Sequence, residues 1–356
     1  MKTAKSIFLL ILATLFLSGC IAGGGRDGGV FKSDNGGNTF SQKVRVDEKK
    51  NIGGVDVLSI AVNPVESSEV YIGTKNHGMF KSVDYGDTWQ PVKILKRAPT
   101  KVYSINIDPF NSKTVYAVAV IDKRGKILKT EDGGESWKDV YTEPASGTSV
   151  LSLALDPVDS KKVYAGTSDG QIIFSENGGD SWKSLYWANN GVYKIAVSKF
   201  NPQVVLFAVF QGSILRTNDG GRSFEDLGKR EIEASEGERY RNSEFLRNPT
   251  AITFDPYRTD WVYVGSSAGL VRSKNAGDSW ELVQILNKPQ EQAIRGVKIN
   301  PQNSDEIIYG ASQTFYKSID GGTNWKTIQF NTNRTLETVV YDPKNPSVIY
   351  VGMNKR

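Results

Sequence analysis

The sequence predicts an all-β fold: a single seven-bladed β-propeller of four-stranded blades, in which strands from both chain ends complete the last blade. A short motif recurs seven times along the chain, and the copies start 42 to 56 residues apart. A period of this length is typical of an array built from one supersecondary unit. Each interval also contains several short segments in which apolar and polar residues alternate, as in half-buried strands.

The recurring motif begins with Ser or Thr, has Asp or Asn two positions later, then Gly, and closes with Trp or Phe, as in residues 82–89. A short Asp or Asn side chain can bond its own backbone and hold a turn, and Gly supplies a positive φ. The closing aromatic ring would be buried against the sheet. Because three of the seven central positions are Asn, we interpret them as structural rather than catalytic or metal-binding. These positions are Asn35, Asp84, Asp132, Asn177, Asp219, Asn275 and Asp320.

The rest of the unit also has the pattern of strands. An alternating apolar run precedes each motif and usually ends in Asp-Pro or Asn-Pro, as in residues 103–109, and Pro ends a strand because it cannot donate to the ladder. Six complete units lie between about residues 55 and 328. The C-terminus adds two strands, 336–341 and 348–352, and the N-terminus adds 29–33, one motif and 39–46. These halves together make a seventh blade, so we assign the propeller to residues 29–356.

Residues 1–20 have the layout of a secretory signal. Lys2 and Lys5 precede an apolar stretch, 7–17, that is too short to span a bilayer, and the segment ends in Leu-Ser-Gly-Cys20. This ending is similar to the bacterial lipobox, which implies lipidation of Cys20 and anchoring to the cell envelope, with the outer membrane favoured where one exists. An ordinary signal with an incidental Cys is the alternative. Residues 21–28 are Gly-rich, and we expect a short flexible tether there.

The seven motifs resemble the Asp-box, or BNR, repeat of sialidases, the sortilin ectodomain, two-propeller xyloglucanases and photosystem II assembly factors. The resemblance covers almost the whole chain after residue 28. It implies either a binding scaffold or a glycoside hydrolase. Sialidases have six blades and a Phe/Tyr-Arg-Ile-Pro motif that is missing here, and the xyloglucanases place catalytic Asp residues across two propellers. Both differences favour a non-enzymatic protein.

Composition excludes several kinds of chemistry. The chain has one His, His77, and one Cys, so Ser-His-Asp catalysis, Cys-His catalysis and His-rich metal sites are not expected. We interpret His77 as a solvated loop residue. The formal net charge is only +5, which does not indicate nucleic-acid binding. We expect no cofactor, no metal and a monomeric protein.

Loops on the face opposite the motifs are the expected binding surface, because loops carry function and because the repeat lapses there. The longest interval contains a charged insertion, 228–248, which is either a solvated excursion or a lid over the central channel. We expect this face to bind an envelope protein, with glycan binding or cleavage as the alternative. Its candidate residues are Arg97, Lys101, Tyr103, Trp187, Tyr193, Arg239, Arg241, Arg247, Arg295 and Arg334.

Overall fold

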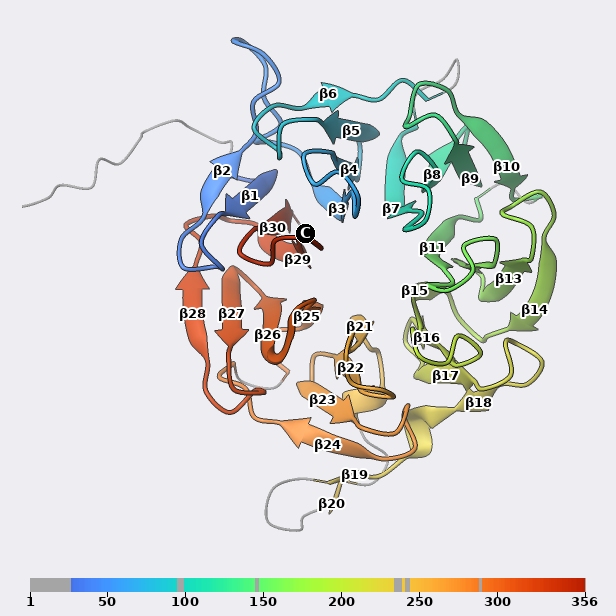
Figure 1. Cartoon of the computed structure of the whole chain (residues 1–356). Coiled ribbons are helices and arrows are strands. Elements are labelled where there is room, and N and C mark those ends of the chain that lie inside the picture. Colours follow the sequence, from blue (N-terminus) through green and yellow to red (C-terminus); the bar gives the residue numbers. More distant parts are fainter. Residues whose placement is uncertain are drawn as a thin grey trace, which may run out of the picture.

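The computed structural model describes residues 27–94, 99–144, 147–233, 239–240, 244–287 and 290–355. These residues form seven β-sheets arranged in a ring around a central axis (Figure 1). The only helical segments within these ranges are two 3-10 turns, η1 (Leu227–Lys229) and η3 (Glu244–Leu246). The predicted all-β, seven-bladed propeller is therefore confirmed.

Blades 1 to 6 each contain four strands in sequence order, with the first strand innermost, and the sheet of blade 5 has two further short strands at its outer edge. Blade 1 contains β3 (Val57–Val62), β4 (Val70–Thr74), β5 (Met79–Ser82) and β6 (Gln90–Pro91). Blade 2 contains β7 (Lys101–Ile107), β8 (Val115–Ile121), β9 (Arg124–Thr130) and β10 (Lys138–Thr142). Blade 3 contains β11 (Val150–Leu155), β12 (Val163–Thr167), β13 (Gln171–Ser175) and β14 (Lys183–Trp187). Blade 4 contains β15 (Val192–Val197), β16 (Val205–Val209), β17 (Ile214–Thr217) and β18 (Glu225–Asp226). Blade 5 contains β21 (Ala251–Phe254), β22 (Val262–Gly265), β23 (Leu270–Ser273) and β24 (Trp280–Val283). Blade 6 contains β25 (Ile294–Asn300), β26 (Asn303–Ala311), β27 (Thr314–Ser318) and β28 (Lys326–Gln329).

Blade 7 joins the two ends of the chain. Its inner strands are β29 (Thr335–Tyr341) and β30 (Ile349–Asn354), and its outer strands are β1 (Val30–Ser33) and β2 (Ser41–Lys43). β1 pairs antiparallel with β30, with Val30 opposite Gly352. This pairing leaves neither β1 nor β30 as an open edge strand.

The described N-terminus is attached to the propeller. Asp27 and Gly28 were expected in the flexible tether, but the Gly28 N–H donates to the Gly53 carbonyl at 2.8 Å. The Asp27 carboxylate accepts the Asn333 N–H at 2.6 Å, on the connection between β28 and β29. Any flexible tether is therefore limited to residues before 27. The predicted signal, lipobox and Cys20 lie outside the described residues.

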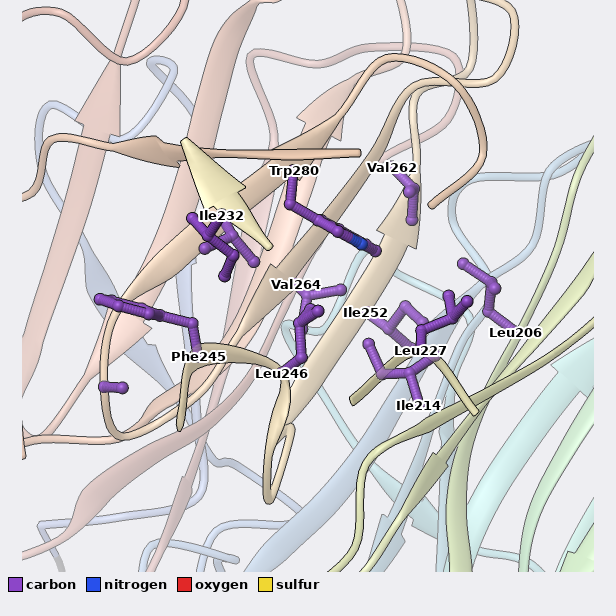
Figure 2. Packing of buried hydrophobic residues seen from close by; sticks show 12 residues of the cluster. Leu206, Ile214, Leu227, Ile232, Phe245, Leu246, Ile252, Val262, Val264 and Trp280 are labelled. Carbon is purple, nitrogen blue, oxygen red and sulfur yellow. The ribbon is translucent and has the colours of Figure 1, made fainter. Parts of the chain in front are cut away.

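The hydrophobic core lies between blades as well as within them. The cluster in Figure 2, for example, brings Leu206 and Ile214 of blade 4 against Val262 and Trp280 of blade 5. Burial of one large apolar side chain contributes roughly 1.5–3 kcal/mol. Because each blade shares its core with its neighbours, the ring stabilises every blade in it.

Each Asp-box motif is held by the same set of hydrogen bonds. In blade 1 the Ser82 hydroxyl donates to Asp84 at 2.8 Å and accepts the Gly86 N–H at 2.8 Å. Asp84 in turn accepts the N–H of Thr88 at 2.8 Å. Gly86 has a φ of 87°, a conformation that strongly favours glycine. The motif also links blades, since the Trp89 indole N–H donates to the Lys43 carbonyl of blade 7 at 3.0 Å.

The insertion at 228–248 joins the outer edge of blade 5. Within it, β19 (Ile232–Glu233) pairs parallel with β24 and antiparallel with β20 (Arg239–Tyr240). Ile232 and Leu246 are buried in the cluster of Figure 2. The two short strands lie on the outer rim, away from the channel (Figure 1). The described part of the insertion is therefore not a purely solvated excursion, because its apolar residues anchor it to the outer edge of blade 5, while its last residue, Asn248, reaches the channel mouth.

Candidate binding site at the channel mouth

The propeller has two distinct faces. The Asp-box hairpins lie on the same face as the turns between the first and second strands, as shown by the Gly133 N–H of one motif donating to the Lys113 carbonyl at 2.9 Å. We call this the box face. The connections between blades and the turns between second and third strands lie on the opposite side, which we call the loop face.

The loop face has a cavity of about 500 Å³ at the mouth of the channel. Inner strands start here, so each blade presents its first side chains to this cavity. Three sequence-predicted residues, Tyr103, Tyr193 and Arg295, meet there although they come from blades 2, 4 and 6. The full lining is Leu58, Tyr103, Leu151, Tyr193, Lys194, Phe210, Asn248, Thr250, Arg295 and Glu337.

Electrostatic contacts at this mouth are few. Arg295 Nη1 lies 3.7 Å from Glu337 Oε2. Lys101, another predicted residue, places Nζ 5.3 Å from the centre of the Tyr103 ring, within cation–π range. The Tyr193 hydroxyl is buried and has no hydrogen-bond partner among the described residues. Burial raises the pKa of Tyr193, so the hydroxyl is a neutral donor at physiological pH.

A second, more apolar cavity of about 300 Å³ opens on the box face. Lys298 of β25 is its only charged lining residue. Burial, and then repulsion from Lys194, lower the pKa of Lys298 to about 8. Sequence reasoning missed Lys298. The signal that could have found it is a lysine at a repeat position where other blades have a small residue. The equivalent residues in blades 1, 3 and 4 are Ala61, Ala154 and Ala196.

The remaining predicted residues are elsewhere. Trp187 is 57% exposed, but it ends the outermost strand of blade 3 rather than lining the channel. Arg247 is exposed just after η3. Arg97 and Arg241 lie outside the described residues, and for Arg239 only the backbone is described.

Arg334 corrects our expectation of an exposed binding residue. It is only 7% exposed, and its guanidinium pairs with both Asp27 and Asp56. It also donates to the Gly54 carbonyl at 3.0 Å. Arg334 therefore joins blade 7 to the N-terminus and to blade 1, since burying a guanidinium requires partners of this kind.

Candidate groups for hydrolysis do not gather in either channel cavity. Glycoside hydrolysis normally uses two carboxyl groups that flank the bond, yet Glu337 is the only carboxylate lining these cavities. Among the described residues Glu143 is the one carboxyl group with a raised pKa, owing to its burial and then to Asp169. Glu143 lines neither of the channel cavities. The described residues contain no cluster of His, Cys, Asp and Glu suited to a metal ion.

Comparison with known proteins agrees with this architecture. A family model described as "Sortilin, neurotensin receptor 3" matches residues 28–140. Curated proteins gave no match. None of the described helical segments is long and apolar enough to span a membrane.

Several solved structures share the fold. The GH74 xyloglucanase from Xanthomonas campestris superposes with a TM-score of 0.70 and 15% identity, over 88% of this chain and 52% of the enzyme. This chain thus spans about half the length of that protein. YCF48 bound to a D1 peptide gives a TM-score of 0.62 and 15% identity, over 85% of this chain and 93% of YCF48. YCF48 from Cyanidioschyzon merolae gives 0.60 and 16%, over 84% and 95%.

The predicted resemblance to Asp-box propellers of the sortilin type and of the photosystem II assembly-factor type, represented by YCF48, is confirmed. The same fold serves the peptide-bound YCF48 and the xyloglucanase. At these identities the likeness concerns the fold alone, because unrelated functions share propeller scaffolds.

Proposed function

We propose that this protein is a non-catalytic, lipid-anchored scaffold of the cell envelope that binds a segment of a partner protein at the loop-face mouth. The observation that carries the proposal is the convergence of Tyr103, Tyr193 and Arg295 around one cavity. Aromatic residues and Arg are enriched where proteins bind one another. The structure of YCF48 with a D1 peptide gives a precedent for peptide binding by this fold.

Anchoring through Cys20 would orient this site. Asp27 is held on the loop face by Asn333, so a lipid only seven residues earlier would keep that face toward the membrane. Seven residues span at most about 25 Å when fully extended. The partner expected at the mouth is therefore a membrane protein or a protein bound close to the membrane surface.

A paired-variant experiment tests the site. Tyr103→Ala combined with Arg295→Gln removes an aromatic and a cation from the mouth, whereas Trp187→Ala removes an exposed aromatic from the rim. We expect in-cell crosslinking to recover the same partner with the wild type and with Trp187→Ala, and at least tenfold less with the double variant. Equal recovery from all three would contradict the proposed site. Release of a Cys20→Ala variant from the membrane fraction is the expected result for the anchor.

The alternative function is glycan binding or cleavage, favoured by the fold shared with the xyloglucanase. Screening polysaccharides and sialosides for both binding and release of reducing ends separates it from protein binding. We expect no release, because the channel cavities lack a pair of carboxyl groups. Measurable release that disappears in Glu143→Gln would instead assign a hydrolase.

A further inference from the structure

Each Asp-box motif is bonded to the blade before it through one backbone carbonyl. This carbonyl belongs to the residue after the Asp or Asn, and in six of the seven motifs it accepts a side-chain donor of the preceding blade at 2.8 to 3.1 Å. The donors and their carbonyls are Tyr350 to Tyr85, Tyr71 and Lys81 to Gly133, Tyr116 to Gly178, Arg216 to Ala276, Arg272 to Gly321 and Lys317 to Gly36. The seventh carbonyl, Gly220 in the motif of blade 4, accepts no side-chain bond from the described residues.

A single residue of blade 3 explains the missing donor. In the other six blades the residue directly before the motif is a cation: Lys32, Lys81, Lys129, Arg216, Arg272 and Lys317. Blade 3 has Phe174 there, opposite Tyr164 on the neighbouring strand, and the two ring centres are 4.6 Å apart. A phenyl ring cannot donate to the Gly220 carbonyl. Tyr164 is only 2% exposed, yet its hydroxyl has no hydrogen bond within the described part of the chain.

A second donor between the same two blades is also missing. In blades 5 and 7 the carboxylate after the inner strand accepts a hydroxyl of the next blade. These bonds are Ser304 to Asp255 at 2.6 Å and Ser67 to Asp342 at 2.8 Å. The equivalent carboxylate of blade 3 is Asp156, which is 1% exposed, and the position of the serine is taken by Pro202, which has no donor. Asp156 accepts the N–H groups of Val158 and Asp159 in its own turn, and no described cation lies within ion-pair distance of it.

Both gaps open into one cavity of about 510 Å³ on the box face, which we call the interblade cavity. Its lining includes Asp156, Tyr164, Phe174, Pro202 and Gly220. Four carboxylates and three cations line it: Asp156, Asp159, Glu176 and Asp219, with Lys162, Lys183 and Arg222. Both lysines have carboxylate partners, since Lys183 is 2.7 Å from Glu176 and Lys162 is 3.6 Å from Asp159. The groups that lack their usual partner are therefore acceptors, and one of them is a buried carboxylate.

We propose that the interblade cavity binds the guanidinium group of an arginine in a segment of another protein. The two donors that the repeat lacks here are a cation and a hydroxyl, and a guanidinium supplies five N–H donors in one planar group. It can donate to the Gly220 carbonyl and to the Asp156 carboxylate together. The chain itself uses this chemistry in the next blade, where the Arg216 guanidinium donates to the Ala276 carbonyl at 3.0 Å.

This site is separate from the proposed function. It lies on the box face between blades 3 and 4, whereas the proposed partner site lies at the loop-face mouth. Binding to it therefore does not depend on Tyr103 or Arg295. The double variant Tyr103→Ala with Arg295→Gln should bind an arginine peptide at the interblade cavity as the wild type does, so failure of one proposal leaves the other standing.

The test is a titration of the purified protein at pH 7 and constant ionic strength, followed by two-dimensional amide NMR. The probes are acetyl-Gly-Arg-Gly-amide and the same peptide with citrulline, which keeps the shape of arginine but carries no charge. We expect saturable shifts of the Gly220 and Gly221 amide signals with the arginine peptide, and at least tenfold weaker binding of the citrulline peptide. The Gly178 and Gly179 amides of the preceding motif are the internal control and should not shift, because Tyr116 already occupies the Gly178 carbonyl.

Variants that repair or remove the acceptors sharpen the test. Phe174→Lys gives blade 3 the residue that donates in blade 1, and it should weaken binding of the arginine peptide at least tenfold. Asp156→Asn should do the same by removing the buried charge, while keeping the turn, because Asn63 accepts the equivalent N–H at 2.9 Å. The control Asp108→Asn makes the same change in blade 2, outside the interblade cavity, and should leave affinity unchanged. Cooperative thermal unfolding of each variant checks that it is folded.

Three results would overturn the proposal. They are equal binding of the arginine and citrulline peptides, unchanged affinity in both Phe174→Lys and Asp156→Asn, and no saturable shift of Gly220 with the arginine peptide. Sedimentation tests the occupant: self-association that is lost in Phe174→Lys would place the arginine on a second copy of this chain instead of another protein. Selective binding of the arginine peptide that both variants weaken, to a protein that sediments as a monomer, supports the site.

Discussion

Each face of the propeller carries a set of side chains at equivalent positions in every blade, but the two sets differ in their chemistry. On the loop face the equivalent residues change class from blade to blade: Leu58, Tyr103, Leu151, Tyr193, Thr250, Arg295 and Glu337. On the box face, the tips of the turns after the inner strands are apolar in five consecutive blades. These tip residues are Val65, Phe110, Val158, Phe200 and Tyr257, followed by Gln302 and Lys344.

The turns on the box face hold their tip residues outward. Asp108 accepts the Phe110 N–H at 2.8 Å, and Phe110 remains 64% exposed. Asn300 and Asp342 make the same bond to Gln302 and Lys344, so the turn itself does not demand an apolar side chain. Singly exposed apolar side chains are normal on a protein surface. The comparison shows that a repeat fixes where a side chain lies and leaves its chemistry free on both faces.

The largest expected effect separates a motif tryptophan from a rim tryptophan. Trp89 is fully buried and donates to the Lys43 carbonyl, so Trp89→Ala should lower the free energy of unfolding by about 3–5 kcal/mol. Trp187 is 57% exposed, so Trp187→Ala should change it by less than about 0.5 kcal/mol. Chemical denaturation of both variants checks this difference. Similar losses would mean that Trp187 is packed as tightly as the motif ring.

The second largest expected effect tests whether Arg334 stabilises the fold although it lies on the loop face. Arg334→Met leaves Asp27 and Asp56 without their cation, and we expect a loss of about 3 kcal/mol because removing one partner of a buried pair is costly. Partner recovery at the mouth should stay unchanged once the variant is folded. If Arg334→Met is as stable as the wild type but recovers less of the partner, Arg334 belongs to the binding surface.

A smaller effect is expected from one Asp-box hydroxyl. Ser82→Ala removes the acceptor of the Gly86 N–H and the donor to Asp84, and it should cost about 1–2 kcal/mol. Ser82→Thr should retain most of this stability, because four of the six motifs outside blade 1 begin with Ser and two with Thr. Denaturant midpoints of the two variants give the comparison. If Ser82→Ala and Ser82→Thr unfold at the same denaturant concentration, the hydroxyl does not contribute to the stability of the motif.

The smallest effect concerns the acidic motif position. The Asn324 N–H, the Asn324 side chain and the Ser318 hydroxyl hold the pKa of Asp320 at about 2, below its ordinary 3.8. Its ionised form therefore stabilises the fold above about pH 4, and this contribution is lost as the pH falls through 2. Asp320→Asn should shift the melting temperature at pH 7 by less than about 2 °C and make it less sensitive to acid. A large shift at pH 7 would imply a role that Asn35, Asn177 and Asn275 do not share.

Much of the fold is predictable because its information is local. The hydroxyl, the Asp or Asn, and the Gly of each motif bond one another within eight residues, so blade number and closure can be read along the chain. The candidate site is only partly predictable. Tyr103, Tyr193 and Arg295 were predicted because inner strands must start at the channel. Arg334 also lies near the start of an inner strand, but contacts with residues distant in the sequence bury it.

The sequence by itself determined the repeat, the turn chemistry and the pairing of both chain ends in one blade, because all three follow from short-range patterns. Only the tertiary structure decided which repeat positions meet across the ring. Lys194 and Lys298 lie on the inner strands of blades 4 and 6, and the sequence contains no local signal that places them in the two channel cavities. Their places depend on ring closure, which gathers inner strands that are far apart in the chain around one axis.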